Sequence, residues 1–171
     1  MCLPRPASAI GYARRINHQT NTMKIADFLA PADVKIDVAS TDKKKLLSEL
    51  ARNAGAELDI ASDAIATALL KREDLGSTGV GGGVAIPHAR FQHAKTPFGM
   101  LARLKKPVDY DAVDGKPVDI VFLLLFPEDT GGEQQLGALA SIARKLRTPA
   151  VTAALRGARD SMDMYRILTS D

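Results

Sequence analysis

The sequence predicts one α/β domain with a central mixed β-sheet flanked by helices, and three features of the chain support this. Residues 34–38 alternate apolar and polar side chains, which is typical of a half-buried strand. Residues 118–126 are almost entirely apolar and too few for a typical long helix, so we expect a central strand covered on both faces. Several other segments carry apolar residues at helical spacing. Strands interleaved with helices indicate the α/β class.

In the N-terminal half we expect a short element at residues 25–29, the strand at 34–38, and two helices. Asp42 and the two hydroxyl residues before it offer N-cap chemistry for the first helix, which should end near Gly55. The second helix should be capped near Ser62 and end near Arg72. The buried positions expected in these helices are Leu46, Leu47, Leu50, Ala51, Ile65, Ala66, Leu69 and Leu70.

In the C-terminal half we expect strands at residues 98–104 and 118–126, the latter ended by Pro127. A helix should follow residues 129–132, and two more should span 150–156 and 162–168, with Ser161 as the cap of the last. The inner face expected for the first of these helices consists of Leu136, Leu139, Ile142, Ala143 and Leu146.

Residues 75–90 form the most unusual stretch of the chain. Ser77 and Thr78 precede four glycines in five positions, of which the last three are Gly81, Gly82 and Gly83. Glycines let backbone N–H groups approach a ligand closely, and successive amides can form a concave nest for an anion. The two hydroxyls and these three glycine amides are therefore candidate phosphate donors.

Pro87 and His88 follow the glycines directly. Pro87 fixes its own φ and pushes Ile86 into an extended conformation, so we expect His88 to leave the end of a strand in a set direction. An imidazole beside an anion-accepting loop is suited to taking up a phosphoryl group. The alternative is a tight hairpin with an incidental surface histidine.

Two other interpretations of the glycine run do not fit. No Gly-Lys-Ser/Thr follows it, which excludes a nucleotide P-loop, and Val84 stands where a dinucleotide fingerprint needs glycine. We find no carboxylate cluster that indicates a metal, and a metal pair formed by His88 and His93 is only weakly suggested by their spacing. No cofactor is expected.

The stretch from Arg72-Glu73 through the glycines to Ile86-Pro87-His88 resembles the active-site signature of fructose/mannitol-type enzyme IIA domains. These belong to the phosphoenolpyruvate-dependent phosphotransferase system, and the similarity is greatest to the nitrogen-related branch. It extends from about Ile25 to Leu168. The resemblance implies that His88 accepts a phosphoryl group from an HPr-like phosphocarrier and that Arg72 steadies it. From the residues alone, Arg72 would be a cation at a helix end.

The sequence departs from that family at Gln135, where many members carry a second histidine. A glutamine can hydrogen-bond an imidazole or a phosphate oxygen, but it cannot carry a switchable charge. The resemblance implies a phosphocarrier that acts mainly as a nitrogen-related regulator on target proteins. Two alternatives remain: a sugar-specific IIA component with a separate IIB component, and a regulatory binding module that works without phosphorylation.

Charge and hydropathy limit the other function classes. Arg5, Arg14 and Arg15 are the only full charges in residues 1–23, so the remainder balances to zero and indicates no nucleic-acid face. The single cysteine, Cys2, fits a reducing cytoplasm. The longest apolar run is too short to span a membrane. We expect residues 1–22 to be a disordered N-terminal extension and residues 23–171 to form the enzyme IIA domain.

Overall fold

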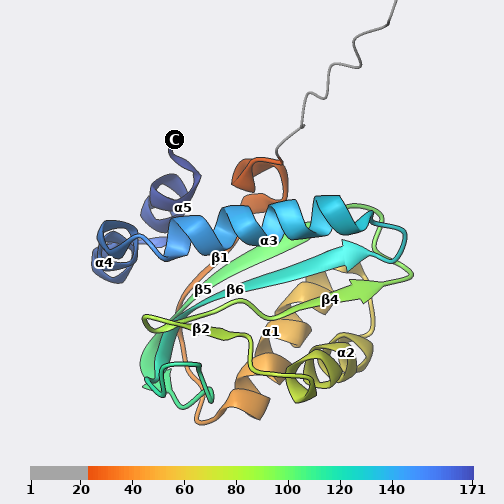
Figure 1. Ribbon diagram of the computed structural model, residues 1–171, viewed down its shortest axis with the longest axis horizontal. Coiled ribbons are helices and arrows are strands. Elements are labelled where there is room, and N and C mark those ends of the chain that lie inside the picture. The colour runs from red at the N-terminus through yellow and green to blue at the C-terminus, as the bar shows by residue number, and fades with distance from the viewer. Residues whose placement is uncertain (1–22) are drawn as a thin grey trace, which may run out of the picture.

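Six strands form one mixed sheet between two layers of helices in the computed structural model, which describes residues 23–171 (Figure 1). The expectation for residues 1–22 lies outside the described residues. The strands are β1 (Leu29–Val38), β2 (Gly79–Gly81), β3 (Val84–Ala85), β4 (His88–Phe91), β5 (Phe98–Val108) and β6 (Val118–Pro127). The helices are the short 3₁₀ helix η1 (Ile25–Asp27) and α1 (Lys43–Leu58), α2 (Ser62–Asp74), α3 (Gly132–Leu146), α4 (Pro149–Gly157) and α5 (Ser161–Thr169). The predicted α/β fold is confirmed.

The strand β6 is the centre of the sheet, as predicted. The strand order is β1-β5-β6-β3-β2, and β4 also pairs with β6. β6 runs antiparallel to β5 and parallel to both β3 and β4, so the sheet is mixed. Nearly every side chain of β6 is buried, because helices cover both faces of the sheet.

The two faces of the sheet bury separate apolar clusters. One cluster joins α1 and α2 to the sheet, with Leu46, Leu50 and Ile65 fully or almost fully buried. The other joins α3, α4 and α5 to the opposite face through residues such as Ile142 and Leu155. Figure 1 shows α1 and α2 below the sheet and α3, α4 and α5 above it.

Several element boundaries differ from the prediction. α1 is capped by Asp42, whose side chain accepts a hydrogen bond from the Lys45 amide at 2.9 Å, but the helix continues past Gly55. Gly55 is there for packing, since a Cβ atom would lie 2.6 Å from the Ile60 carbonyl oxygen. The helix ends instead before Asp59, which adopts the left-handed conformation with φ 54°.

The caps of α2 and α5 also differ. α2 begins after Ala61, which provides no side-chain cap, and Asp160 rather than Ser161 caps α5. β1 begins earlier than expected and passes through Pro31, which an edge strand tolerates because one side needs no donor. Leu136 was predicted on the inner face of α3, but it is exposed, because the buried stripe of this helix runs through Ala138, Ile142 and Leu146 instead.

Candidate functional site

His88 is the first residue of β4 and pairs with Leu124 of β6. The expectation that it ends a strand is corrected, since β3 stops at Ala85 and the chain re-enters the sheet after Pro87. Side chains alternate along β4, and Ala89 packs into the cluster beneath α1 and α2. His88 therefore points to the other side of the strand.

The imidazole of His88 is held at both nitrogens. Its Nδ1 lies 2.9 Å from the carbonyl oxygen of Ile86, and the Nε–H of Arg72 points at Nε2 with a separation of 3.2 Å. A carbonyl oxygen can only accept, so Nδ1 carries the proton and donates it to Ile86. Nε2 then keeps its lone pair, which accepts from Arg72. The geometry selects one tautomer and leaves Nε2 as the nucleophilic nitrogen.

Burial lowers the pKa of His88 below its ordinary value, and the positive charge of Arg72 lowers it further. The hydrogen bond to Ile86 and the charge of Glu73 act in the opposite direction but do not outweigh these effects. The ring is therefore neutral at physiological pH, which is the state in which a histidine nitrogen can attack phosphorus.

Arg72 lies in the last turn of α2 and is itself anchored. One of its terminal nitrogens donates to the carbonyl oxygen of Gly76 at 2.8 Å. Gly76 has φ 147°, a conformation that L side chains rarely adopt. This fixes the guanidinium beside the imidazole, where its remaining N–H groups can bind the oxygens of a phosphoryl group.

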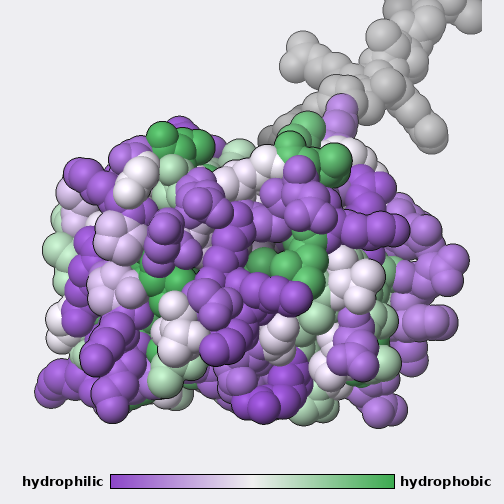
Figure 2. Space-filling model, turned by 90° about the horizontal axis from the view of Figure 1, so that it is seen from below, coloured by the Kyte–Doolittle hydropathy of each residue, from purple (hydrophilic) through white to green (hydrophobic). Residues whose placement is uncertain are grey.

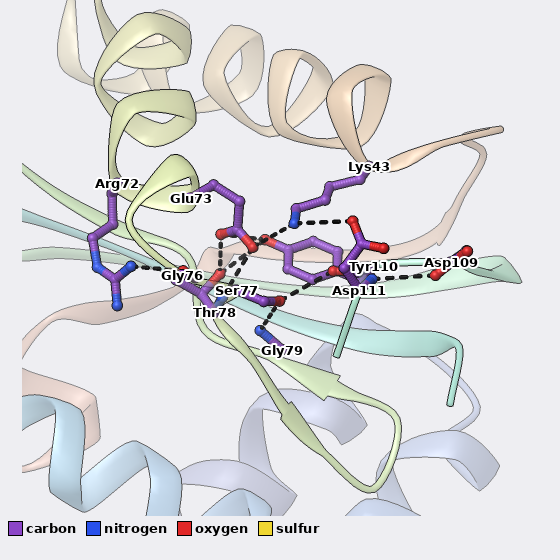
Figure 3. A network of polar contacts seen from close by, with 10 residues as sticks. All are labelled: Lys43, Arg72, Glu73, Gly76, Ser77, Thr78, Gly79, Asp109, Tyr110 and Asp111. Atoms are coloured by element: carbon purple, nitrogen blue, oxygen red, sulfur yellow. Dashed lines mark hydrogen bonds and ion pairs between the residues drawn. The ribbon is translucent and has the colours of Figure 1, made fainter. Parts of the chain in front are cut away.

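A buried polar network links the C-terminal end of α2 to the segment that leads into β2 (Figure 3). The Glu73 carboxylate accepts from the Thr78 amide at 2.9 Å and from the Thr78 hydroxyl at 2.6 Å, and it pairs with Lys43 at 2.8 Å. Burial alone would raise the pKa of Glu73, but Lys43 and Thr78 outweigh it and lower the pKa. Glu73 thus fixes the backbone on either side of Gly76 and thereby the position of Arg72.

Tyr110 completes this network. Its hydroxyl lies 3.0 Å from the Thr78 hydroxyl, and the ammonium of Lys43 sits 4.9 Å from its ring centre. Burial raises the pKa of Tyr110 well above its ordinary value. Sequence patterns do not indicate the roles of Glu73, Lys43 and Tyr110, because these residues lie far apart in the chain. The only signal was that Glu73 belongs to the stretch that resembles the family signature.

The two hydroxyls expected to bind phosphate have other partners. The Thr78 side chain is buried against Glu73 and Tyr110, and the Ser77 hydroxyl donates to the Tyr110 carbonyl oxygen at 3.1 Å while accepting from the Gly79 amide. Both side chains therefore support the loop that carries Arg72 and Gly76. Neither has a contact with His88 among the described residues.

The glycines Gly81, Gly82 and Gly83 lie at the tip of the β2–β3 hairpin rather than beside His88. The Gly83 carbonyl oxygen accepts hydrogen bonds from the amides of Asp119 and Ile120 in β6. His88 instead pairs with Leu124, farther along β6. Five residues of strand separate these levels by roughly 16 Å. This corrects the expectation that the three glycine amides cradle the phosphoryl group.

The glycines serve the hairpin instead. Each has a positive φ, the Gly82 amide donates to Asp114, and the Gly82 carbonyl accepts from Arg156 at 2.9 Å. Arg156 also makes two contacts with the Asp119 carboxylate, at 2.7 and 2.8 Å. These contacts fasten the hairpin to α4.

Gln135 lies in the first turn of α3, as expected, but its side-chain partner is Arg90 rather than His88. The Arg90 Nε–H donates to the Gln135 amide oxygen at 2.6 Å. Arg90 is two residues beyond His88 and so lies on the same side of β4. Gln135 therefore approaches the site through Arg90, from α3, while Arg72 approaches from α2.

Other candidate features contribute nothing to the site. His93 is exposed in the loop after β4. Within residues 23–171, we find no group of three histidine, cysteine, aspartate or glutamate side chains that could hold a metal ion. None of the helices in this range is both long and apolar enough to cross a bilayer.

Comparisons with known proteins agree with this fold and chain length. Residues 27–171 match the family described as "Phosphoenolpyruvate-dependent sugar phosphotransferase system, EIIA 2". A nitrogen regulatory protein of Bradyrhizobium diazoefficiens is 43% identical over 146 residues, which cover 85% of this chain and 95% of that protein.

Solved structures give the same result. Nitrogen regulatory protein IIA-Ntr from Neisseria meningitidis superposes with a TM-score of 0.80 at 35% identity, covering 85% of this chain and 99% of that one. The mannitol enzyme IIA of Escherichia coli, in its complex with phosphorylated enzyme IIB, shares the fold with a TM-score of 0.67 at 13% identity, covering 81% and 95%. The chain therefore belongs to the fructose/mannitol-type enzyme IIA family of the phosphoenolpyruvate-dependent phosphotransferase system.

Proposed function

We propose that this phosphocarrier accepts a phosphoryl group on Nε2 of His88 from the phosphohistidine of an HPr-like donor, and that its phosphorylation state controls binding to regulatory targets. The observation that carries the proposal is the pair of ring contacts. Nδ1 is committed to the Ile86 carbonyl, and Nε2 faces Arg72 with its lone pair available.

In the proposed transfer, the Nε2 lone pair forms the new N–P bond. The N–P bond to the donor ring breaks, and its electron pair returns to the donor nitrogen. Nδ1 of His88 keeps its proton, so the product ring is cationic and its charge is stabilised by the Ile86 carbonyl oxygen. The Arg72 N–H group that first points at Nε2 then donates to a phosphoryl oxygen, which is charge-assisted and stronger than the contact it replaces.

The regulatory output follows from the charge that the phosphoryl group adds. It carries roughly −1.5 to −2 charges near neutral pH, enough to change an interface strongly. Leu75, which directly follows α2, and Leu136 of α3 are large exposed apolar side chains at the two helices that flank the site. Apolar side chains around a group that gains charge suit a partner surface that distinguishes the two states.

The test is incubation with phosphoenolpyruvate and the general phosphotransferase proteins, followed by intact-mass measurement. Wild-type protein should gain one phosphoryl group and His88→Ala none. His93→Ala is the matched control, because it removes an exposed histidine five residues away and should be phosphorylated normally. Phosphate on His88→Ala protein would contradict the assignment, and unmodified wild-type protein would favour the module that works without phosphorylation.

A sugar-specific role is the second candidate. The family description includes sugar transport, and the mannitol enzyme IIA binds a phosphorylated IIB enzyme in its solved complex. Transfer from phosphorylated His88 to a purified fructose- or mannitol-type IIB component tests this directly. Rapid loss of phosphate to IIB would favour the sugar-specific role, whereas retention on His88 supports the regulatory one.

A further inference from the structure

A second surface with the character of a binding site lies along the outer side of α1. It is a groove of about 1040 Å³, called here the α1 groove. One wall is a stripe of α1 that includes Lys44, Ser48 and Arg52, spaced by four residues and spanning roughly 12 Å. The other wall is Lys105 and Lys106, near the end of β5, and the far end reaches the first turn of α2.

The α1 groove is lined mainly by basic side chains, although the domain as a whole has no net charge. Its lining contains five lysines and arginines and only two carboxylates, those of Glu49 and Asp63. Residues 24–171 carry equal numbers of basic and acidic side chains, so the groove is a local excess. Figure 2 shows that the face formed by α1 and α2 is predominantly hydrophilic.

Three of these cations have no ion-pair partner within residues 23–171. Arg52 pairs with Glu49, and Lys45 lies 3.7 Å from the Asp42 carboxylate. The three without such a partner are Lys44, Lys105 and Lys106, all exposed. They face the same groove from α1 and β5, and together they are complementary to an anionic partner.

The lining of the groove indicates which kind of anion. It holds no aromatic side chain on which a nucleobase could stack, which argues against a single-stranded nucleic acid. Ser40, Ser48 and Ser62 also line the groove. Their hydroxyls can hydrogen-bond the backbone of an extended peptide, while carboxylates of that peptide pair with the lysines. We propose that the α1 groove binds an acidic, extended segment of a partner protein.

This site is distinct from the His88 site. Lys43 is adjacent to Lys44 in sequence, but its side chain turns inward to the buried Glu73 carboxylate, whereas Lys44 points outward into the groove. A peptide in the α1 groove therefore leaves the face around His88 open to a donor protein. Binding there should not require phosphorylation.

The experiment measures fluorescence anisotropy of a labelled peptide of alternating glutamate and serine. About six residues span roughly 20 Å when extended, which is long enough to cover the roughly 12 Å stripe of Lys44, Ser48 and Arg52. Wild-type protein should bind it, and affinity should fall as salt increases. The triple variant Lys44→Gln, Lys105→Gln, Lys106→Gln should bind about eightfold more weakly, with each single change contributing about twofold.

A control variant with the same loss of charge distinguishes binding in the groove from nonspecific attraction to the protein's net charge. The triple variant Lys95→Gln, Lys116→Gln, Arg159→Gln removes the same charge at exposed positions outside the groove and should alter affinity by less than about twofold. His88→Ala should bind like wild type although it accepts no phosphate. Failure of phosphorylation would thus leave this result unchanged.

Four results would overturn the proposal. The first three are that wild-type protein does not bind the peptide, that both triple variants lose the same affinity, and that His88→Ala loses binding. The fourth is tighter binding of an oligothymidylate or of inorganic tripolyphosphate than of the peptide at equal charge. That result would assign the groove to a nucleic acid or a small polyanion instead.

Discussion

The Nε–H of Arg72 points at Nε2 of His88 from 3.2 Å, across sixteen residues of sequence that include the entire glycine hairpin. This contact joins the last turn of α2 to the first residue of β4. It places a permanent positive charge at the nitrogen that would carry a phosphoryl group, and it lowers the pKa of the ring.

Arg72→Ala should slow phosphorylation of His88 by about 10- to 100-fold, because a hydrogen bond to a charged group contributes about 1.5–3 kcal/mol. Arg72→Lys should recover only part of the rate, since an ammonium cannot contact the ring and a phosphoryl oxygen in the same planar geometry. Quenched-flow sampling with intact-mass detection measures both. Wild-type rates in Arg72→Ala would remove Arg72 from the site.

The pH dependence of the acceptor should reflect the lowered pKa of His88. The ring should titrate below 6.5, so the phosphorylation rate should be level near neutral pH and fall only at more acidic pH, where the ring becomes protonated. NMR titration of the histidine ring protons gives the pKa directly. Arg72→Gln should raise it, because the neighbouring charge is removed, and a pKa at or above 6.5 in wild type would contradict the burial argument.

Glu73→Gln should destabilise the protein by about 3 kcal/mol, since it removes the close, buried partner of Lys43 and leaves only the exposed Asp111 carboxylate at 3.7 Å. The folded-state pKa of Glu73 is below its ordinary value of 4.5. The stability it provides is therefore present above about pH 4.5 and is lost as pH falls through the lowered value. Urea unfolding across this range should show a weaker acid dependence in Glu73→Gln than in wild type, with Glu133→Gln as the exposed control.

Gly83→Ala should destabilise the protein more than Gly82→Ala, although both glycines have positive φ. A Cβ atom at Gly83 would lie 2.5 Å from the Arg156 guanidinium and 2.9 Å from Asp119, whereas nothing lies within 4 Å at Gly82. We expect about 1 kcal/mol for Gly82→Ala from backbone strain alone and about 2 kcal/mol for Gly83→Ala. Thermal unfolding measures the difference.

The same two variants also test what the hairpin does. Both should be phosphorylated at the wild-type rate, because the hairpin tip is roughly 16 Å from His88 along the sheet. A large loss of phosphorylation in a folded Gly82→Ala protein would restore the phosphate-binding role that the sequence suggested for this amide.

Gln135→His should leave the fold intact and change the phosphorylation rate less than Arg72→Ala does. Gln135 is half-buried, and its amide contacts Arg90 rather than the ring, so its influence on His88 passes through another side chain. Rates for Gln135→Ala, Gln135→His and Arg90→Ala separate these contributions. If Gln135→Ala were slower than Arg72→Ala, the two supporting roles would be reversed.

The sequence by itself determined the class of fold, the buried central strand and the suitability of His88 as a phosphoryl acceptor, whereas the role of Arg72 beside it was implied by the resemblance to the family signature. The first three are recorded locally: apolar residues at helical and strand spacing, an apolar run of strand length, and a proline before a histidine that follows a glycine-rich stretch. The end of α1 could not be predicted from the sequence. Gly55 lies within the helix because the Ile60 carbonyl oxygen leaves no room for a side chain there, and this contact is not visible in the sequence.

Only the tertiary structure decided which neighbours in sequence are neighbours in space. The glycines next to His88 in the chain are carried away from it, because a parallel strand pairing places the hairpin tip five residues along β6. Conversely, Lys43, Glu73, Thr78 and Tyr110 meet in one buried network although they come from four separate segments. Local patterns determine which elements form, whereas the burial of polar groups, which requires a partner for each, determines how the site is assembled.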